Sequence, residues 1–543
     1  MSSFLSNNPA ELSQALLDQK RSMEEAQAKK LASLQQLPYL NMQSFPLDLN
    51  SLALITKEEA LNAESVPFFK EGKNIKIATT NPKNPLLKEI QKKLSEKFTT
   101  TLYSVSRTSF LHTLDFYDKV VVPTSKFHEV ITVDSKTDYL SKLPGLAKHL
   151  DNATEALTII FGSALAQESS DIHLEPEDHL VKIRFRVDGV LHDAVMLPKA
   201  SQRAIISRLK LMARLKLNIE NEAQDGRITI LSNNIELDVR VSVLPSSYGE
   251  AIVMRLLGVG AVDLEIEQLG LRGKAGEVIQ SQLHKANGMI ITTGPTGSGK
   301  TTTLYSFLKE LNKPGVKIIT LEDPVEYKVE GIQQTPIDHR VDFSFAKALR
   351  SVLRQDPDVV MVGEIRDPET AETALQAALT GHVVLSTLHT NDAAGAVPRL
   401  LTMGIKPFII APAINAIIAQ RLVRRLCQFC LKPTGLDAPT LQRVKAILAD
   451  LPPSSGITAP TDLTFYTSTG CEKCAGLGYK GRMGIYEVIE ITDQMKELIL
   501  KEPSGLAVKK LAVEQGCLTM LQDGILKSLE KITDVHEVFR VAG

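Results

Sequence analysis

A glycine-rich run near residue 300 has the spacing of a phosphate-binding loop. Gly294-Pro-Thr-Gly-Ser-Gly-Lys-Thr301 fits the pattern G-x-x-x-x-G-K-[ST], and the apolar run Met289–Ile291 precedes it. Glycines let backbone N–H groups converge on phosphates, the lysine reaches the β and γ oxygens, and the Thr301 hydroxyl would ligate Mg²⁺. An ordinary turn is the alternative, but the strand-loop-helix context favours nucleotide binding. The predicted binding residues are Gly294, Pro295, Thr296, Gly297, Ser298, Gly299, Lys300, Thr301 and Thr302.

Two groups of carboxylates follow further predicted strands. Glu322, Asp323 and Glu326 come after the apolar run Ile318–Leu321, and Glu364 comes after Val359–Val362. Strand C-termini in a parallel sheet converge on the ligand crevice, so we expect Glu322 and Glu364 near the γ-phosphate. Helix N-capping is the alternative for either group alone. Two such groups behind a phosphate loop favour a catalytic role, because hydrolysis needs a metal-binding acid and a group that activates water.

A histidine follows the next predicted strand. Val383–Thr387 delivers His389, with Thr387 and Asn391, toward the same edge of the sheet. A lone histidine is more often structural. Since this polar cluster again follows a buried strand, we favour a γ-phosphate sensor.

Four of the five cysteines form two C-x-x-C pairs, Cys427/Cys430 and Cys471/Cys474. Four thiolates in this arrangement suit tetrahedral, structural Zn²⁺, and a redox pair is the alternative. The Pro- and Ser-rich stretch Leu451–Pro460 between the pairs is interpreted as an inserted loop. Cys517 stands apart and is expected to be a small buried hydrophobe.

Composition gives weak limits on function. The 543 residues suggest three or four domains, and 62 basic against 63 acidic residues argue against a dedicated nucleic-acid binder. Arg421, Arg424 and Arg425, at helical spacing, lack accompanying aromatic residues, so a subunit contact or a solvated face is favoured over nucleic acid. The N-terminus lacks signal-peptide features and the longest apolar region, Phe408–Ala419, is too short to span a bilayer, which predicts a cytosolic or peripheral protein.

The elements that must position these residues fall into successive modules. Residues 1–37 are predicted to form a polar helix that either docks or stays solvated. Val181–Val187 and Ile235–Val243 alternate with period two, which predicts half-buried antiparallel strands around a helix at Ala204–Leu217, with Asp-Gly turns at Gly189 and Gly226. Buried strands alternate with helices from about 263 to 420, which predicts a parallel sheet covered on both faces.

The segments Leu353–Asp367 and Thr380–Asn391 resemble those of the secretion ATPases that power type II secretion and type IV pilus assembly. The phosphate loop, an aspartate box, an unusual Walker B and a histidine box appear in the family's order. The resemblance implies that Glu322 is the catalytic base and that Glu364, after Gly363, is the acid that holds Mg²⁺ and water. The tetracysteine set resembles the secretion and pilus-extension branch rather than the retraction branch.

The family works as a hexamer in which arginines from the module before the motor close over the nucleotide. The matching residues here are Arg240 and Arg255, and a solvent-facing cation is the alternative for Arg240. Arg350, Arg354, Arg366 and Arg399 match further family arginines, and the stretch Gln224–Arg227 is family-like with an expected structural or domain-contact role. The linker Leu257–Glu265, with Gly258 and Gly260, would be the hinge between two lobes.

The predicted fold class is α/β, with a RecA-like P-loop core, two preceding modules, a zinc-binding insert and a helical C-terminus. The predicted domains are 1–45 (helix and linker), 46–140 (N-terminal secretion-ATPase-like module), 145–262 (pre-motor α+β module), 263–426 (RecA-like ATPase core), 427–482 (tetracysteine zinc subdomain) and 483–543 (C-terminal helices).

The resemblance implies a hexameric cytoplasmic ATPase that uses ATP, Mg²⁺ and Zn²⁺ to power pilin or pseudopilin assembly. It would be peripheral to the inner membrane through a platform protein and would bind no nucleic acid. The alternatives are a nucleotide-gated assembly scaffold, a nucleic-acid translocase and a retraction motor.

Overall fold

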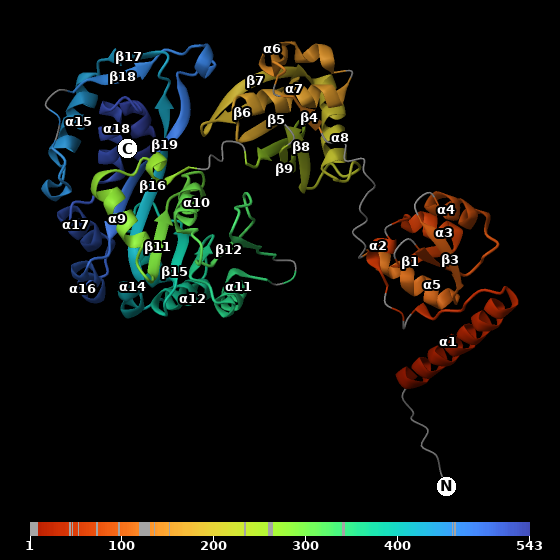
Figure 1. Ribbon diagram of the computed structural model, residues 1–543. Coiled ribbons are helices and arrows are strands. Elements are labelled where there is room, and N and C mark those ends of the chain that lie inside the picture. The colour runs from red at the N-terminus through yellow and green to blue at the C-terminus, as the bar shows by residue number, and fades with distance from the viewer. Residues whose placement is uncertain are drawn as a thin grey trace, which may run out of the picture. The chain divides into compact units, whose positions relative to one another are not determined.

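The computed structural model divides the chain into two units, residues 1–129 and 130–543, which are described separately. The described residues are 9–42, 45, 47–52, 54–71, 74–95, 98–118, 131–134, 136–150, 152–232, 235–258, 264–338, 341, 343–458, 460 and 463–543. Figure 1 labels the elements. Among the described residues, no helix combines the length and the apolar character that a membrane span requires.

The first unit is a small α/β module with a long helix beside it. Its elements are α1 Pro9–Leu34, α2 Leu49–Leu52, α3 Lys57–Ala63, β1 Ser65–Glu71, β2 Asn74–Thr79, α4 Pro85–Ser95, β3 Thr99–Ser104 and α5 Arg107–Leu114. The sheet order is β1-β2-β3, and Phe68, Ile75, Ile77 and Leu87 form part of its core. Helix α1 docks on this module, because the Glu25 carboxylate accepts hydrogen bonds from the hydroxyls of Ser106 (2.6 Å) and Ser109 (2.9 Å).

A seven-stranded sheet opens the second unit, in the order β4-β8-β9-β10-β5-β6-β7. Its elements are β4 Ile131–Val133, α6 Tyr139–Lys142, α7 Ala153–Ala166, β5 Asp171–Pro176, β6 Leu180–Val187, β7 Val190–Pro198, α8 Gln202–Met212, β8 Gln224–Ser232, β9 Ile235–Ser246 and β10 Gly249–Leu256. Buried residues alternate with partly exposed ones along β6, as period two predicts. The core lies between one sheet face and α7 and α8, with Leu157, Ile160 and Phe161 buried.

One turn prediction in this module is wrong. Gly189 does lie in an Asp-Gly turn, at φ 83°, but Gly226 lies inside strand β8. A Cβ at Gly226 would approach the Ala213 carbonyl oxygen to 2.5 Å. Glycine is therefore needed here for the close approach of two backbones rather than for a turn. Helix α8 also ends at Met212, five residues before the predicted end at Leu217.

The second sheet has the order β13-β12-β14-β15-β11-β16-β19, and its first six strands are parallel. The bounds are β11 Gly288–Thr293, β12 Ile318–Glu322, β13 Gln333–Pro336, β14 Val359–Val362, β15 Val383–Leu388, β16 Ile414–Leu426 and β19 Tyr479–Glu490. Apolar residues pack on both faces: Met289 and Ile291 belong to one core cluster and Ile290 to the other. The predicted two-layer covering of a parallel sheet is confirmed, with β19 added as an antiparallel edge strand.

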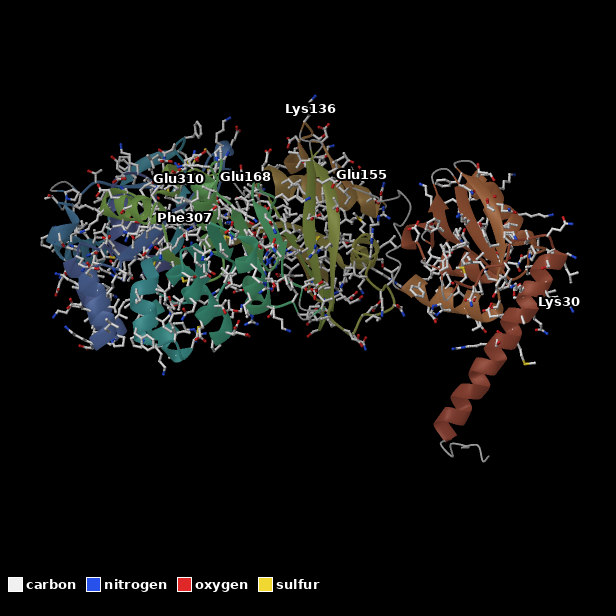
Figure 2. All side chains as sticks on the ribbon, turned by 60° about the horizontal axis from the view of Figure 1, so that its bottom comes forward. Lys30, Lys136, Glu155, Glu168, Phe307 and Glu310 are labelled. Atoms are coloured by element: carbon white, nitrogen blue, oxygen red, sulfur yellow. The ribbon has the colours of Figure 1, made fainter. Side chains whose placement is uncertain are left out.

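Helices cover this sheet (Figure 1). They are α9 Gly273–Leu283, α10 Lys300–Leu311, α11 Phe345–Val352, α12 Pro368–Leu379, α13 Ala396–Thr402 and α14 Pro407–Ala413. In Figure 2, Phe307 of α10 lies among the side chains of the core, and it is fully buried. The mixed α/β fold predicted from the sequence is thereby confirmed.

The remaining elements follow the first cysteine pair. They are β17 Leu431–Thr434, α15 Ala438–Ala449, β18 Phe465–Ser468, α16 Asp493–Lys501, α17 Gly505–Glu514, α18 Met520–Leu529 and α19 Val535–Ala542. Strands β17 and β18 form a separate antiparallel pair. The C-terminus is helical, as predicted.

The helical spacing predicted for Arg421, Arg424 and Arg425 is wrong, because all three lie on strand β16. The strand pairs with β11 on one side and with β19 on the other, and these ladders override the local pattern. Arg424 is not solvated either: it stacks on the Tyr479 ring at 3.8 Å and is bonded to a buried carboxylate.

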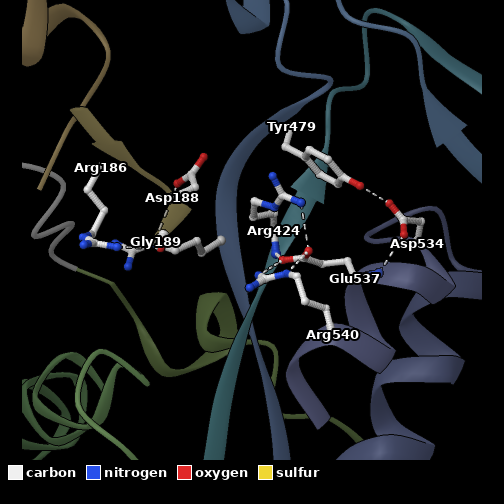
Figure 3. Close-up of polar contacts among 9 residues, drawn as sticks. Arg186, Asp188, Gly189, Arg424, Tyr479, Asp534, Glu537 and Arg540 are labelled. Atoms are coloured by element: carbon white, nitrogen blue, oxygen red, sulfur yellow. Dashed lines mark hydrogen bonds and ion pairs between the residues drawn. The ribbon is translucent and has the colours of Figure 1, made fainter. Parts of the chain in front are cut away.

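That carboxylate belongs to Glu537 of α19 and ties the C-terminal helix to the sheet (Figure 3). Its oxygens accept from Arg424 Nη2 (3.0 Å) and from Arg540 Nη2 (2.6 Å) and Nε (2.8 Å). Burial alone would raise the pKa of Glu537, but the two guanidinium groups lower it to about 2. The ion pairs therefore favour the charged form of a residue that is 1% exposed.

We expect this cluster to make stability depend on pH. The folded-state pKa of Glu537 lies below the unfolded value of about 4.3, so its contribution is complete above that pH and is lost as pH falls toward 2. The pKa difference corresponds to about 2 kcal/mol after discounting the half-exposed Arg540. Melting curves of wild type and Glu537→Gln should differ at pH 7 and converge near pH 2. Glu497→Gln, an exposed control, should match wild type at every pH. A difference in melting temperature between wild type and Glu537→Gln that stays constant from pH 7 to pH 2 would contradict the expectation.

Candidate functional site

The phosphate-binding loop connects β11 to α10, as its position after an apolar strand predicts. Gly294 has φ 145°, and a Cβ there would lie 2.6 Å from the Gln420 carbonyl oxygen, so no side chain fits. Gly299, with φ 88°, is the residue before the helix. Ser298 is buried and its hydroxyl has no hydrogen-bond partner among the described residues. The loop thus has the backbone shape of an anion cradle at a helix N-terminus.

Lys300 begins α10 and folds back across the loop. Its Nζ donates to the carbonyl oxygens of Gly294 (2.8 Å) and Pro295 (3.0 Å). Burial lowers the pKa of Lys300, the charge of Arg421 lowers it further, and the charge of Glu364 opposes both. Arg421 is itself partly buried, and its Nη1 has no hydrogen-bond partner within the described part of the chain. Two cations therefore lie close enough to repel each other beside the loop, a situation that an anionic ligand would relieve.

Glu364 and His389 come together at the ends of β14 and β15. His389 Nε2 lies 3.3 Å from Glu364 Oε2, and Arg366 Nη2 lies 2.7 Å from Oε1. The Thr387 hydroxyl donates to the Gly363 carbonyl oxygen at 2.8 Å, which ties the two strand ends to each other. The parallel sheet therefore assembles an acid, a histidine and an arginine from segments 25 residues apart.

Glu322 ends strand β12 and is 3% exposed. Its carboxylate accepts hydrogen bonds from the Thr320 hydroxyl (2.5 Å), from Gln334 Nε2 (3.2 Å) and from the Tyr305 hydroxyl. None of these three donors belongs to the phosphate-binding loop. Glu322 is thus held in place by side-chain hydrogen bonds, whereas Glu364 is the acid whose charge acts on Lys300.

The two predicted arginines of the pre-motor module, Arg240 and Arg255, belong to a row of charged residues that crosses the sheet. Arg227 of β8 is paired with Arg240 of β9, which is paired with Arg255 of β10. The row continues to Asp171 and Arg186, and Asp171 accepts from Arg255 Nε at 2.9 Å. Arg240 has no such anion: its buried Nε and Nη2 lack partners among the described residues. Like charges directly opposite each other destabilise a sheet, which points to an anion as the missing partner.

A cavity of about 1210 Å³ adjoins this row. Its lining includes the three arginines together with Asp323, Lys328 and Asp338 of the loops after β12 and β13. The polar face of the sheet and the edge of the parallel sheet that follows Glu322 thus contribute to one hollow. Arg227, expected to have a structural or domain-contact role, belongs to the row, and the register of β8 against β9 places it there.

The other predicted arginines have separate surroundings. Arg350 pairs with Glu369 at 2.5 Å, and Arg354 Nη1 donates to the Arg350 carbonyl oxygen at 2.8 Å. Of the predicted hinge, Leu257, Gly258, Leu264 and Glu265 are described, while residues 259–263, Gly260 included, lie outside the described residues.

The four cysteines of the two C-x-x-C pairs meet in space. All four Sγ atoms lie within 4.8 Å of one another, and three of the pairs are separated by 3.8, 3.8 and 3.9 Å. A tetrahedral ion with Zn–S bonds of about 2.3 Å requires S–S separations of about 3.8 Å, so the site fits zinc. A redox pair needs only two thiols, so it does not explain why four of them converge.

Hydrogen bonding favours the thiolate at one of these cysteines. Burial alone would raise the pKa of Cys474, but the backbone N–H groups of Cys471 (3.1 Å) and Gly478 (3.2 Å) help to lower it to about 7. Burial raises the pKa of Cys427 to about 11, which favours the protonated thiol there. Burial also raises the pKa of Cys517, which lies outside the cluster and is half-buried rather than fully buried.

Comparisons with known proteins identify the family to which this chain is similar. The family described as "Type II/IV secretion system protein" matches residues 147–540. The type IV pilus assembly ATPase PilB of Myxococcus xanthus is 38% identical over 510 residues, which cover 92% of this chain and 88% of that protein. The type II secretion system protein E of Pseudomonas aeruginosa is 46% identical over 386 residues, covering 71% and 74% of the two chains.

A solved structure supports the fold. The ATPase DotB of Legionella pneumophila superposes with a TM-score of 0.52 at 20% identity, covering 71% of this chain and 94% of that one. This likeness concerns the fold alone.

Proposed function

The chain belongs to the type II/IV secretion system protein family, and we propose that it hydrolyses ATP with the residues at the carboxyl edge of its parallel sheet. As a type II secretion and type IV pilus assembly ATPase, it powers the assembly of pilin or pseudopilin. The observation that carries the catalytic proposal is the convergence of Lys300, Glu364 and His389 beside a loop that only glycine can form at Gly294.

The phosphates would bind across Gly294–Thr302. The backbone N–H groups of the loop and the N-terminus of α10 supply positive dipoles, and Lys300 would exchange its two carbonyl partners for phosphate oxygens. Thr301 is exposed at the start of α10 and would hold Mg²⁺ together with Glu364. Bound Mg²⁺ would supply charge that neutralises the phosphates.

The chain's other groups would complete the reaction. Glu322 would accept a proton from the attacking water, and His389, oriented by Glu364, would sense the γ-phosphate. Arg240 and Arg255 would add positive charge as the bond breaks, and Arg366, Arg350, Arg354 and Arg399 are candidates for contacts within or between subunits.

We infer that the four cysteines hold a structural Zn²⁺ that closes the subdomain 427–482. The separations of the sulfur atoms support this ion, and the backbone donors to Cys474 orient one of its ligands. We further propose a homohexamer, placed in the cytoplasm and peripheral to the inner membrane, that acts on a platform protein of the pilus or secretion apparatus.

The Arg240 proposal predicts opposite effects on activity and on stability. Arg240→Ala should lower the rate of ATP turnover by about 10²-fold, because an unpaired cation facing the transition state is lost. The melting temperature should stay equal or rise, since two buried nitrogens of the guanidinium lack partners among the described residues and its cross-strand neighbours are cationic. Arg203→Ala, on the exposed side of α8, should change neither. A lower melting temperature with full turnover would show that Arg240 is structural.

Phosphate release distinguishes the proposed motor from its alternatives. Purified full-length protein should release phosphate in a Mg²⁺-dependent manner, and a cytoplasmic fragment of a platform protein should stimulate it. Stimulation by single- or double-stranded DNA instead would favour a nucleic-acid translocase. ATP binding and ring assembly without release would favour a nucleotide-gated scaffold.

A further inference from the structure

The carboxylate of Glu322 is held by three donors that come from three different elements. Thr320 belongs to β12 itself, Gln334 to β13, and Tyr305 to α10, the helix that the phosphate-binding loop opens. The Tyr305 hydroxyl donates to Oε2, whereas Thr320 and Gln334 both donate to Oε1. This hydrogen-bond cluster is buried, since Glu322 and Tyr305 are each 3% exposed.

The distribution of these bonds is unequal. Each carboxylate oxygen offers two lone-pair directions. Oε1 already has two donors, Thr320 at 2.5 Å and Gln334 at 3.2 Å. Oε2 has the Tyr305 hydroxyl alone among the donors described here, so one acceptor direction remains on that oxygen. A base needs one such free direction, pointed at the proton that it receives.

Gln334 also fixes the position of Tyr305. Its Nε2 lies 3.3 Å from the Tyr305 hydroxyl and 3.0 Å from the Tyr327 carbonyl oxygen, while its Oε1 accepts from the Val329 N–H at 2.8 Å. The rings of Tyr305 and Tyr327 meet edge to face at 4.5 Å between centroids. Burial first, and then the charge of Glu322, raise the pKa of Tyr305 far above its ordinary value, so the hydroxyl keeps its proton.

We propose that Tyr305 is a positioning residue for ATP hydrolysis. Its hydrogen bond leaves a single acceptor direction on Glu322 Oε2 and directs that position at the attacking water. Gln334 and Thr320 assist by occupying Oε1. The inference rests on the proposed role of Glu322 as the base. It also gives α10 a second role, because the helix that would bind phosphate at Lys300 orients the base through Tyr305, about 1.4 turns further along.

Tyr305→Phe keeps the ring and removes only the hydroxyl. We expect kcat to fall by about 10-fold while KM for ATP changes by less than about 2-fold, because the hydroxyl acts on the base rather than on substrate binding. Thr320→Val, which is isosteric and suits a buried strand, should lower kcat in the same way and provides the test if Tyr305→Phe folds poorly.

Tyr479→Phe is the matched control. Tyr479 also donates to a buried carboxylate, that of Asp534, but lies in the C-terminal cluster (Figure 3). Its loss should lower the melting temperature as much as Tyr305→Phe does and leave kcat unchanged. A purely structural role for Tyr305 predicts that both variants behave alike.

A double-mutant cycle separates this inference from the proposed function. In the Glu322→Gln background, single-turnover rates should change by less than about 2-fold when Tyr305→Phe is added, since the base that Tyr305 orients is gone. An unchanged kcat in Tyr305→Phe, or an equal loss in both backgrounds, would overturn the inference. Full turnover by Glu322→Gln alone would instead refute the assignment of Glu322 as the base.

Discussion

Replacing Glu364 by Gln is expected to lower ATP turnover by about 10²–10³-fold, which corresponds to about 3–4 kcal/mol of transition-state stabilisation. Glu364 is the acid whose charge reaches Lys300, and His389 and Arg366 are held on its two oxygens. Gln keeps the shape of the side chain but removes the negative charge that a metal ligand and a partner for His389 require. ATP affinity should change little, because the loop and Lys300 remain.

Glu322→Gln should have a similar effect on turnover for a different reason, the loss of the proton acceptor. Phosphate release measures turnover for both variants, and binding of a fluorescent ATP analogue measures affinity. Glu372→Gln, an equally isosteric change on the exposed side of α12, is the control and should retain wild-type turnover. Turnover that persists in both Glu322→Gln and Glu364→Gln would show that the catalytic residues lie elsewhere.

The second large effect is expected at the cysteine cluster. Cys474→Ser should lose the metal, because the Cys474 thiol lies within 4 Å of two others and receives two backbone hydrogen bonds. Zinc binding is worth about 10–16 kcal/mol in small zinc peptides, and here that energy would hold the segment from Cys427 to Cys474 closed. We therefore expect loss of local order without loss of the parallel sheet.

Metal analysis and limited proteolysis measure this prediction. Wild type should contain about one zinc per chain, and Cys474→Ser, or wild type treated with a strong chelator, should be cleaved between residues 427 and 482 first. Cys517→Ser is the control: its sulfur lies outside the cluster, so zinc content should not change. Wild-type protein that is free of zinc yet resists proteolysis in this segment would contradict the structural role.

The parallel sheet and its polar edge could be predicted from the sequence because their signals are local. The apolar runs that became β11, β12, β14 and β15 are each followed by residues of unmistakable chemistry, and parallel topology brings strand ends together. The meeting of Glu364 with His389 is a direct consequence. The four-cysteine cluster was predictable for the same reason, since two C-x-x-C pairs are a local signal typical of a metal site.

The errors arose where tertiary contacts decide. Strand β16 pairs with β11 on one side and with β19 on the other. These two sets of backbone hydrogen bonds fix an extended conformation, so the spacing of Arg421 and Arg424 did not indicate a helix. Gly226 is required by the approach of the Ala213 backbone, a neighbour that no local pattern reveals. The donors around Glu322 could not be predicted from local sequence either. Tyr305 lies on a helix and Gln334 on an edge strand, and only the folded sheet brings both to the same carboxylate.

The row of arginines could be predicted only in part. Arg240 and Arg255 were expected from the family resemblance, but their alignment with Arg227 needs the register of three antiparallel strands. Register depends on the whole sheet, because a slip by one residue would move each arginine to the opposite face. The domain boundaries and the roles assigned to the site residues remain predictions.

The most direct measurement is phosphate release by purified full-length protein, assembled into rings, with ATP and with or without Mg²⁺. The account predicts turnover that requires Mg²⁺ and disappears in Lys300→Ala. The reason is that the ammonium of Lys300 lies across the loop that should hold the phosphates. Rings that bind ATP yet release no phosphate with Mg²⁺ present, or that release it equally well without Lys300, would contradict it.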